Sequence, residues 1–246
     1  MIYLDYQATT PLAPEAREEM LRWLDGPGGT GFGNPHSPHR MGRMAAAAVE
    51  LAREQIAALL PPGGKVIFTS GATEALNLAL RGTQGPVLTF AAEHAAVLDC
   101  ALAVTAQGRQ FSILPTLPDG QADCQALSAA SIGGGGLVTA MLVNNEIGTI
   151  NPLEQVAAMA RTGGASVLCD AVQGFGRIVM PDCADLIALS AHKIHGPKGV
   201  GALWVREGIS LDPLLFGGGQ EQGLRSGTLS PALCAGFGAA AALAKI

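Results

Sequence analysis

Several features that mark common classes of protein are missing from this sequence. It carries a net charge of −5 and has no basic patch, which argues against nucleic acid as a partner. No apolar stretch approaches the roughly 20 residues that a membrane-spanning helix needs. The first residues, Met1–Asp5, lack the charged and apolar regions of a signal peptide. We therefore expect a cytoplasmic protein that binds neither membranes nor nucleic acid.

Cysteines are few, and their spacing is not that of a disulfide framework or a metal site. The five are Cys100, Cys124, Cys169, Cys183 and Cys234. Their number is odd and no two have C-x-x-C spacing, which argues against a disulfide framework and against a four-thiolate metal site. We expect buried or incidental thiols in a reducing cytosol, and no bound metal.

The order of elements predicts an α/β fold of one large domain or two small ones. Most of the expected strands are apolar runs bounded by Gly, Pro or polar turns, as in strands covered on both faces. They are 66–70, 87–90, 111–114, 137–143, 167–170, 185–190 and 200–205. Helical patterns alternate with them at 14–24, 40–60, 73–80, 94–106 and 153–161. This alternation predicts a mostly parallel sheet with ligands at the carboxyl edge of its strands. Only a short Gly/Pro turn precedes the last strand, which we therefore expect to be antiparallel.

Lysine is also scarce, with four in the chain, and one has a special setting. Lys193 follows the strand Asp185–Ser190, with Ser190 and His192 just before it and a Gly/Pro-rich turn after it. A lysine at this edge, near the bottom of a pocket, is desolvated. Desolvation lowers its pKa and frees the amine to form a Schiff base.

An acid ends another strand. Asp170 closes the run Ser166–Asp170 and is followed at a short distance by Gln173. A buried acid is costly unless it is paired, and the N–H of a pyridinium ring is a good partner. A lysine imine and an aspartate facing a ring nitrogen are what pyridoxal phosphate (PLP) asks of a protein. The alternative is that Asp170 only caps the next turn.

The segment Phe68–Glu74 joins a strand to a helix. Gly71 permits a tight turn, after which backbone amides and the Thr73 hydroxyl would face an anion at the helix N-terminus. Ordinary capping by Ser70 or Thr73 is the alternative. Together with Lys193 and Asp170, the phosphate interpretation is the stronger.

Other polar groups follow strands in the same way. His94 opens a helix where its ring could stack on a flat cofactor, and Asn145 lies in Val143–Gly148, where Asx-turn chemistry is the alternative. The glycine-rich loop 217–228 could wrap a phosphate, and the loop 31–39 could be a substrate gate or only a connection.

Taken in order, these motifs resemble the cysteine desulfurases, members of the class V branch of the fold-type I PLP enzymes. The matching segments are Tyr3–Pro11, Gly33–Pro35, Thr69–Glu74, Glu93-His94, Val143–Gly148, Asp170–Gln173, His192-Lys193 with Gly196–Gly199, and Arg225–Thr228. The resemblance implies the PLP-binding large domain of this fold, with a mixed, mostly parallel seven-stranded sheet flanked by helices. The large domain would span residues 13–246, and residues 1–12 would normally be part of a smaller domain.

The resemblance also implies a role for each matching residue. Lys193 would carry the internal aldimine and shuttle protons, and His94 would stack on the ring and serve in acid/base steps. Asp170 would keep the ring nitrogen protonated. The remaining contacts to the cofactor would come from Ala72, Thr73, Asn145, Gln173, Ser190 and His192. Thr228 would reach the phosphate of the PLP that a partner subunit binds, which implies a homodimer. Asn34 and Asn145 would orient the substrate carboxylate.

The C-terminal part departs from the family pattern. The last helical pattern, Pro231–Ile246, has no C-cap, so we expect a truncated chain. Family members continue into a small domain with a nucleophilic cysteine and a carboxylate-binding arginine, and neither has a counterpart here.

The resemblance implies conversion of L-cysteine to L-alanine, with sulfur passed as a persulfide to an acceptor or scaffold protein for iron–sulfur cluster assembly or other sulfur-transfer pathways. We expect this activity to be impaired without the nucleophile. The alternatives are another class V reaction, such as that of a selenocysteine lyase or an aminotransferase, and a non-catalytic remnant or dimerisation partner.

Overall fold

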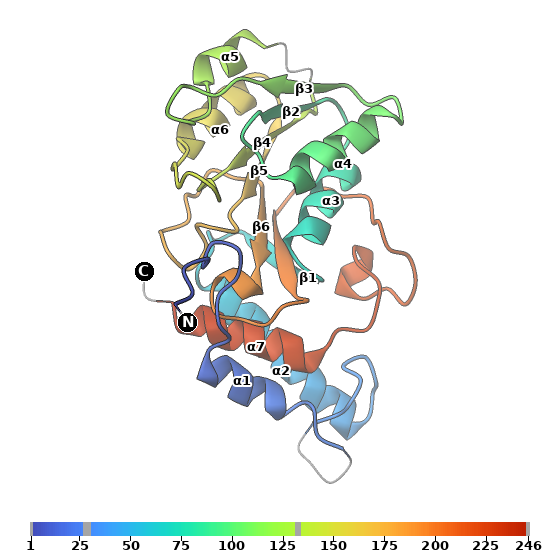
Figure 1. The fold of residues 1–246 in the computed structure, drawn as a ribbon. Helices are drawn as coiled ribbons and strands as arrows, with labels where there is room; N and C mark the ends of the chain where they lie inside the picture. The colour runs from blue at the N-terminus through green and yellow to red at the C-terminus, as the bar shows by residue number, and fades with distance from the viewer. Residues whose placement is uncertain (1, 27–30, 131–133, 245–246) are drawn as a thin grey trace.

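The computed structural model describes residues 2–26, 31–130 and 134–244. Within these ranges, seven strands form one sheet in the order β1-β7-β6-β5-β4-β2-β3 (Figure 1). They are β1 (Gly64–Thr69), β2 (Val87–Phe90), β3 (Phe111–Leu114), β4 (Leu137–Met141), β5 (Ser166–Asp170), β6 (Leu186–Ser190) and β7 (Gly201–Arg206). β7 is antiparallel to both of its neighbours, and every other pair is parallel. The predicted mixed, mostly parallel sheet is confirmed, as is its antiparallel last strand.

The predicted helices are also present, with ends that differ by a few residues. The helices are α1 (Pro14–Leu21), α2 (Arg40–Ala57), α3 (Ala72–Gly82), α4 (Ala95–Thr105), α5 (Cys124–Ala129), α6 (Leu153–Thr162), α7 (Pro231–Ala242), and the 3-10 turns η1 (Ala191–Lys193) and η2 (Glu221–Gly223). α7 ends at Ala242, and the final residues of its predicted range, 245–246, lie outside the described residues. α5 was not predicted, because six residues are too few to reveal a helical period. Its start is set by Asp123, whose Oδ1 accepts hydrogen bonds from Gln125 N and Ala126 N.

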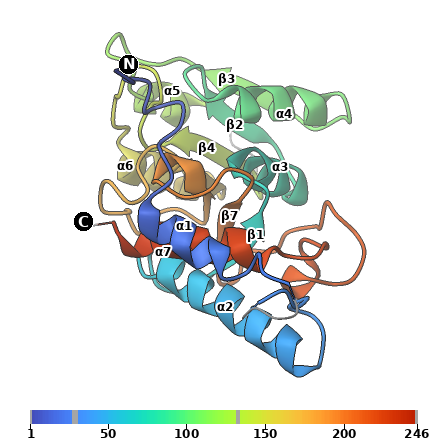
Figure 2. The same ribbon diagram turned by 60° about the horizontal axis from the view of Figure 1, so that its bottom comes forward.

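Helices cover both faces of the sheet. Successive strand residues point to opposite faces, so Phe68 packs in a cluster with side chains of α2, α6 and α7, while Ile67 packs with α3 and α4. Figure 2 shows α1, α7 and α2 side by side beneath the sheet, where α7 contacts both of the others. This double cover explains why most strands are continuous apolar runs.

The sheet brings five sequence motifs to one edge. β1, β2, β4, β5 and β6 all run in the same direction, so the segments that follow them emerge together. Those segments carry Thr73, His94, Asn145, Gln173 and Lys193. Within the described ranges, every helix is too short or too polar to span a bilayer.

Candidate active site

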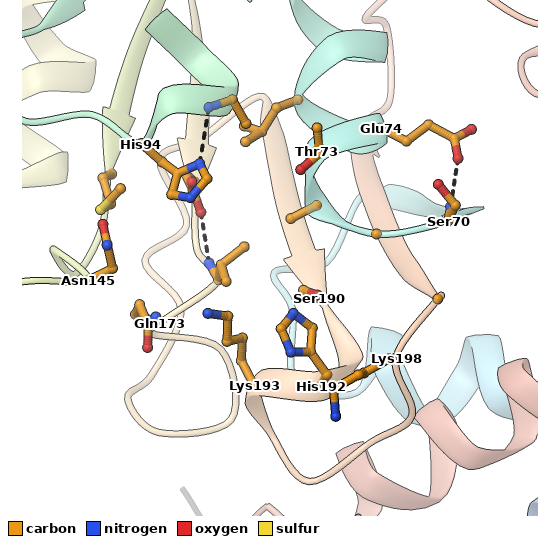
Figure 3. A pocket seen from close by; sticks show the side chains of 18 residues that line it. Ser70, Thr73, Glu74, His94, Asn145, Gln173, Ser190, His192, Lys193 and Lys198 are labelled. Carbon is orange, nitrogen blue, oxygen red and sulfur yellow. Dashed lines mark hydrogen bonds between the residues drawn. The ribbon is translucent and has the colours of Figure 1, made fainter. Parts of the chain in front are cut away.

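A cavity of about 470 Å³ opens at this carboxyl edge of the sheet. Nine of the eleven residues predicted from sequence line it: Ala72, Thr73, His94, Asn145, Asp170, Gln173, Ser190, His192 and Lys193. Figure 3 shows His94 and Asn145 on one side, Thr73, Ser190 and His192 on the other, and Lys193 pointing between them. Segments far apart in the sequence therefore build a single site.

One end of the cavity is suited to an anion. Gly71 is the N-cap of α3, with φ 156° and ψ 177°, a conformation that essentially only glycine adopts, and no described side chain caps the first turn. The free amides of that turn and the helix dipole favour negative charge. The capping by Ser70 or Thr73 that we considered is absent from the described residues. Instead, the Glu74 carboxylate reaches back to Ser70 N at 2.6 Å.

Cationic and hydroxyl groups complete this end. Ser190 and His192 line the cavity, as does Lys198, which sequence reasoning did not assign to the site. The signal for Lys198 was its place in the Gly/Pro turn after Lys193. Burial and the charges of Lys193 and Lys198 lower the pKa of His192, so its ring is neutral at neutral pH. Its Nδ1 lies 3.1 Å from Thr9 Oγ1.

Asp170 lines the cavity and is 4% exposed. Burial raises the pKa of its carboxyl, while the Val172 N–H bond and the charges of His94 and Lys193 act in the opposite direction. Oδ1 accepts from Val172 N at 3.0 Å. Asp170 therefore caps the next turn, as the alternative interpretation expects, and it also lines the cavity, while its pairing with a ring nitrogen stays a prediction.

The amine of Lys193 is held by main-chain oxygens near the N-terminus of the chain. Its Nζ donates to the carbonyls of Gln7, at 2.6 Å, and Ala8, at 3.0 Å. Burial lowers the pKa of Lys193, Arg177 lowers it further, and the carboxylates of Asp170 and Asp5 oppose the shift. Sequence reasoning missed the part played by Gln7 and Ala8, because every residue has the same carbonyl and so leaves no signal.

Gln173, which follows β5, and His94, which precedes α4, both line the cavity. Gln173 Nε2 donates to the Gln7 carbonyl at 2.9 Å. His94 is the N-cap of α4, and its Nδ1 accepts from Ala96 N at 3.0 Å. In a neutral ring this bond assigns the proton to Nε2. His94 thus has a structural role as well as a place in the cavity.

The adjacent amides of Asn144 and Asn145 divide the two predicted roles between them. Asn144 makes the Asx turn, because its Oδ1 accepts from Glu146 N and Ile147 N while its Nδ2 donates to Ala92 O. Asn145 lines the cavity instead.

Asn34 and Thr228 lie outside the cavity lining. The Oδ1 of Asn34 accepts from His36 N at 2.9 Å in an exposed turn. Thr228 is exposed on the glycine-rich loop after β7. That loop is fastened by two ion pairs, Arg225–Glu74 at 2.7 Å and Arg53–Glu221 at 2.8 Å. The roles of Asn34 in substrate binding and of Thr228 in a partner's site remain predictions.

The comparisons with known proteins agree with this geometry. The family model for aminotransferase class-V matches residues 2–246. The chain belongs to the aminotransferase class-V family. No group of three or more metal-ligating side chains suited to an ion occurs in the described part of this class-V chain.

Among its relatives is a cysteine desulfurase IscS from Rickettsia bellii (strain OSU 85-389), 44% identical over 257 residues. The match covers 99% of this chain and 62% of that protein. A solved NifS-like protein is 34% identical with a TM-score of 0.91, covering 99% of this chain and 69% of the other. A structure described as SspA in complex with cysteine is 35% identical with a TM-score of 0.89, covering 98% and 72%. The class-V chain thus spans about three fifths of the length of that curated relative.

Proposed function

We propose that this chain is the cofactor-binding domain of a PLP-dependent cysteine desulfurase. The observation that carries the proposal is the convergence of the Lys193 amine, the Asp170 carboxylate and the free N-terminus of α3 on one cavity. The relatives named cysteine desulfurase, and the SspA structure with cysteine, support the choice of reaction and substrate.

The residues present fit PLP chemically. A phosphate suits the uncapped first turn of α3, where Thr73, Ser190 and Lys198 add hydroxyl and ammonium donors. Gly201 helps to shape this cradle, because a Cβ there would lie 2.5 Å from Leu189 O and 2.7 Å from Gly71 Cα. The cavity volume of about 470 Å³ is in the range of small-molecule sites.

When bound, PLP supplies an aldehyde that condenses with an amine and a ring that withdraws electrons. Lys193 supplies the amine and, as a base of lowered pKa, takes the α-proton of the substrate. Asp170 would hold a proton on the ring nitrogen, and His94 would cover the ring. Asn145 and Gln173 offer amides to the polar groups of cofactor and substrate.

Sulfur transfer needs a thiolate, and the described cysteines are poorly suited to provide one. None lies in the cavity lining. Burial raises the pKa of all five thiols, and that of Cys234 to about 12. We therefore propose that this chain binds PLP and activates the Cα–H bond of L-cysteine, but passes sulfur on poorly.

The wider biology belongs to the same proposal. A homodimer is supported by the exposure of Thr228 outside its own cavity, and by Phe216 on the same loop, which is 83% exposed. The relatives' name IscS supports a sulfur acceptor or scaffold in iron–sulfur cluster assembly. The cytoplasmic location rests on composition alone.

The deciding experiment is an absorbance spectrum of the purified chain after PLP addition, compared with Lys193→Ala. We expect a visible absorbance band that depends on Lys193. Borohydride reduction should attach the cofactor permanently, and mass spectrometry should locate it on the peptide that contains Lys193. Lys198→Ala is the matched control, which should keep the band and bind PLP more weakly.

Absence of the band in the unmodified chain would overturn the proposal and favour a non-catalytic remnant or dimerisation partner. With PLP bound, L-cysteine, L-selenocysteine and other amino acids are then compared. Sulfide and alanine formed at many turnovers from L-cysteine would contradict the claim of poor sulfur transfer. A response to L-selenocysteine or another amino acid alone would indicate a different class V reaction.

A further inference from the structure

Glu93 places a buried carboxyl close to Asp170, outside the cavity lining. It follows β2, is 8% exposed and is absent from the cavity lining. Its Oε1 accepts a hydrogen bond from Met141 N at 2.5 Å. Met141 is the last residue of β4 and is paired with Asp170 across the β4–β5 ladder. Glu93 thus contacts the strand end that neighbours Asp170.

The second oxygen of this carboxyl has no partner. Glu93 Oε2 is buried and accepts no hydrogen bond from any described residue. An ionised carboxylate with an unpaired oxygen in a dry interior is costly, and a proton removes the charge, which is the larger part of that cost. Geometry alone therefore favours the neutral acid.

The groups around Glu93 point the same way. Asp170 is the charged neighbour, and burial together with its negative charge raises the pKa of Glu93 to about 8. The thiol of Cys169, which also senses both acids, stays neutral because its pKa is raised well above the ordinary value by burial. Among the described residues, the Met141 N–H is the one group that favours ionisation of Glu93.

Asp170 has better support for a charge than Glu93 has. It accepts from Val172 N, and the charges of Lys193 and His94 favour its ionised form. Two neighbouring buried carboxyls do not both ionise readily, so the proton goes to Glu93. We propose that Glu93 is a positioning residue, held as a neutral carboxylic acid, that anchors the end of β4 and leaves the negative charge on Asp170, the acid that would face the ring nitrogen of the cofactor. The part that concerns the ring rests on the proposed function, whereas the protonation state does not.

The protonation state is tested on the cofactor-free protein by comparing its unfolding equilibrium with that of Glu93→Gln from pH 5 to 9. The unfolded Glu93 loses its proton near its ordinary pKa, while the folded one keeps it to about pH 8. The unmodified protein should therefore lose stability relative to Glu93→Gln by up to about tenfold in the unfolding constant per pH unit, levelling off above pH 8.

The matched control is Glu207→Gln, the same change at an exposed residue, which should not reproduce the pH-dependent ratio of unfolding constants expected for Glu93→Gln. If the ratio between the unfolding constants of the unmodified protein and of Glu93→Gln does not change with pH, the proposal is overturned. Should that variant not fold, infrared spectra of the unmodified protein decide, because a carboxylic-acid carbonyl band at pH 7 that disappears above pH 8 is expected. Absence of such a band would overturn the proposal too.

The link to the cofactor is tested separately on the PLP-loaded protein. Raising the pH through 8 would place a second negative charge next to Asp170, so the visible spectrum should change there in the unmodified protein and not in Glu93→Gln. An identical change in both would contradict the link to Asp170. Failure to bind PLP at all would refute the proposed function while leaving the stability test intact.

Discussion

The Nζ of Lys193 lies 2.6 Å from the carbonyl oxygen of Gln7, although 186 positions separate the two residues. This contact makes the N-terminal segment part of the site. The same segment is fastened nearby, because Thr10 Oγ1 donates to His192 O at 2.9 Å and accepts from His195 N at 2.7 Å. The orientation of Lys193 thus depends on the N-terminal segment 7–10, called the strap below, which is not part of the sheet.

Thr10→Val should loosen that strap. Thr10 is 3% exposed, and valine keeps its shape while removing both hydroxyl bonds. We expect a loss of about 1–3 kcal/mol in the free energy of unfolding, typical of unpaired buried polar groups, and weaker PLP binding. Urea denaturation and PLP titration measure the two effects. Thr10→Ser keeps the hydroxyl and should stay close to the unmodified protein, whereas equal losses in both variants would argue against the hydrogen bonds.

Asp170→Asn should slow removal of the substrate α-proton. The amide has no negative charge with which to keep the ring nitrogen protonated. We expect exchange of the α-proton of L-cysteine with deuterium to fall by roughly 100-fold, the scale of a lost preorganised electrostatic contact. Proton NMR of the substrate follows this exchange. Borohydride trapping at Lys193 should persist, which separates loss of chemistry from loss of binding. Unchanged exchange would remove Asp170 from its assigned role.

The pH dependence of PLP capture should shift in opposite directions in two variants. Asp170 favours the charged form of Lys193 and Arg177 disfavours it, on top of the lowering of the pKa by burial. Asp170→Asn should therefore lower the pKa of the lysine further and move the rise in capture rate to lower pH. Arg177→Met should move that rise to higher pH. Stopped-flow absorbance across pH 6–10 measures both shifts, and shifts of the same sign would contradict this electrostatic account.

Breaking the Arg225–Glu74 ion pair should disturb both stability and the phosphate cradle. Burial opposes ionisation of Glu74, but hydrogen bonds from Arg225 and Ser70 lower its pKa below the ordinary value. Its contribution is therefore present above the unfolded pKa, near 4.3, and is lost as the pH falls through the folded pKa. Glu74→Gln should cost about 1–3 kcal/mol at pH 7 and almost nothing well below the folded pKa.

Denaturation at several pH values provides the measurement for this pair, and a double-mutant cycle provides its control. Because the two residues act through one contact, Glu74→Gln combined with Arg225→Gln should cost little more than either change alone. Simple additivity would show that the pair does not act as a unit.

Much of this protein was determined by local sequence. Each predicted strand forms because an apolar run ends at a turn, and parallel strands place their carboxyl ends at one edge. That rule alone brought Thr73, Asp170 and Lys193 to a common cavity. Helix α3 begins at Gly71 for an equally local reason, since that backbone conformation essentially requires glycine.

Other features depended on tertiary structure. The contacts of Gln7 and Ala8 with Lys193 use main-chain carbonyls, which carry no residue-specific signal. The turn after β4 uses the side-chain amide of Asn144 for its hydrogen bonds, so Asn145, and not Asn144, lines the cavity. Glu93 meets the neighbourhood of Asp170 only because β4 lies between β2 and β5 in the sheet, and strand order is a non-local property. Local patterns thus determined the elements and the edge at which the site forms, whereas packing between distant segments decided which groups there are free, paired or charged.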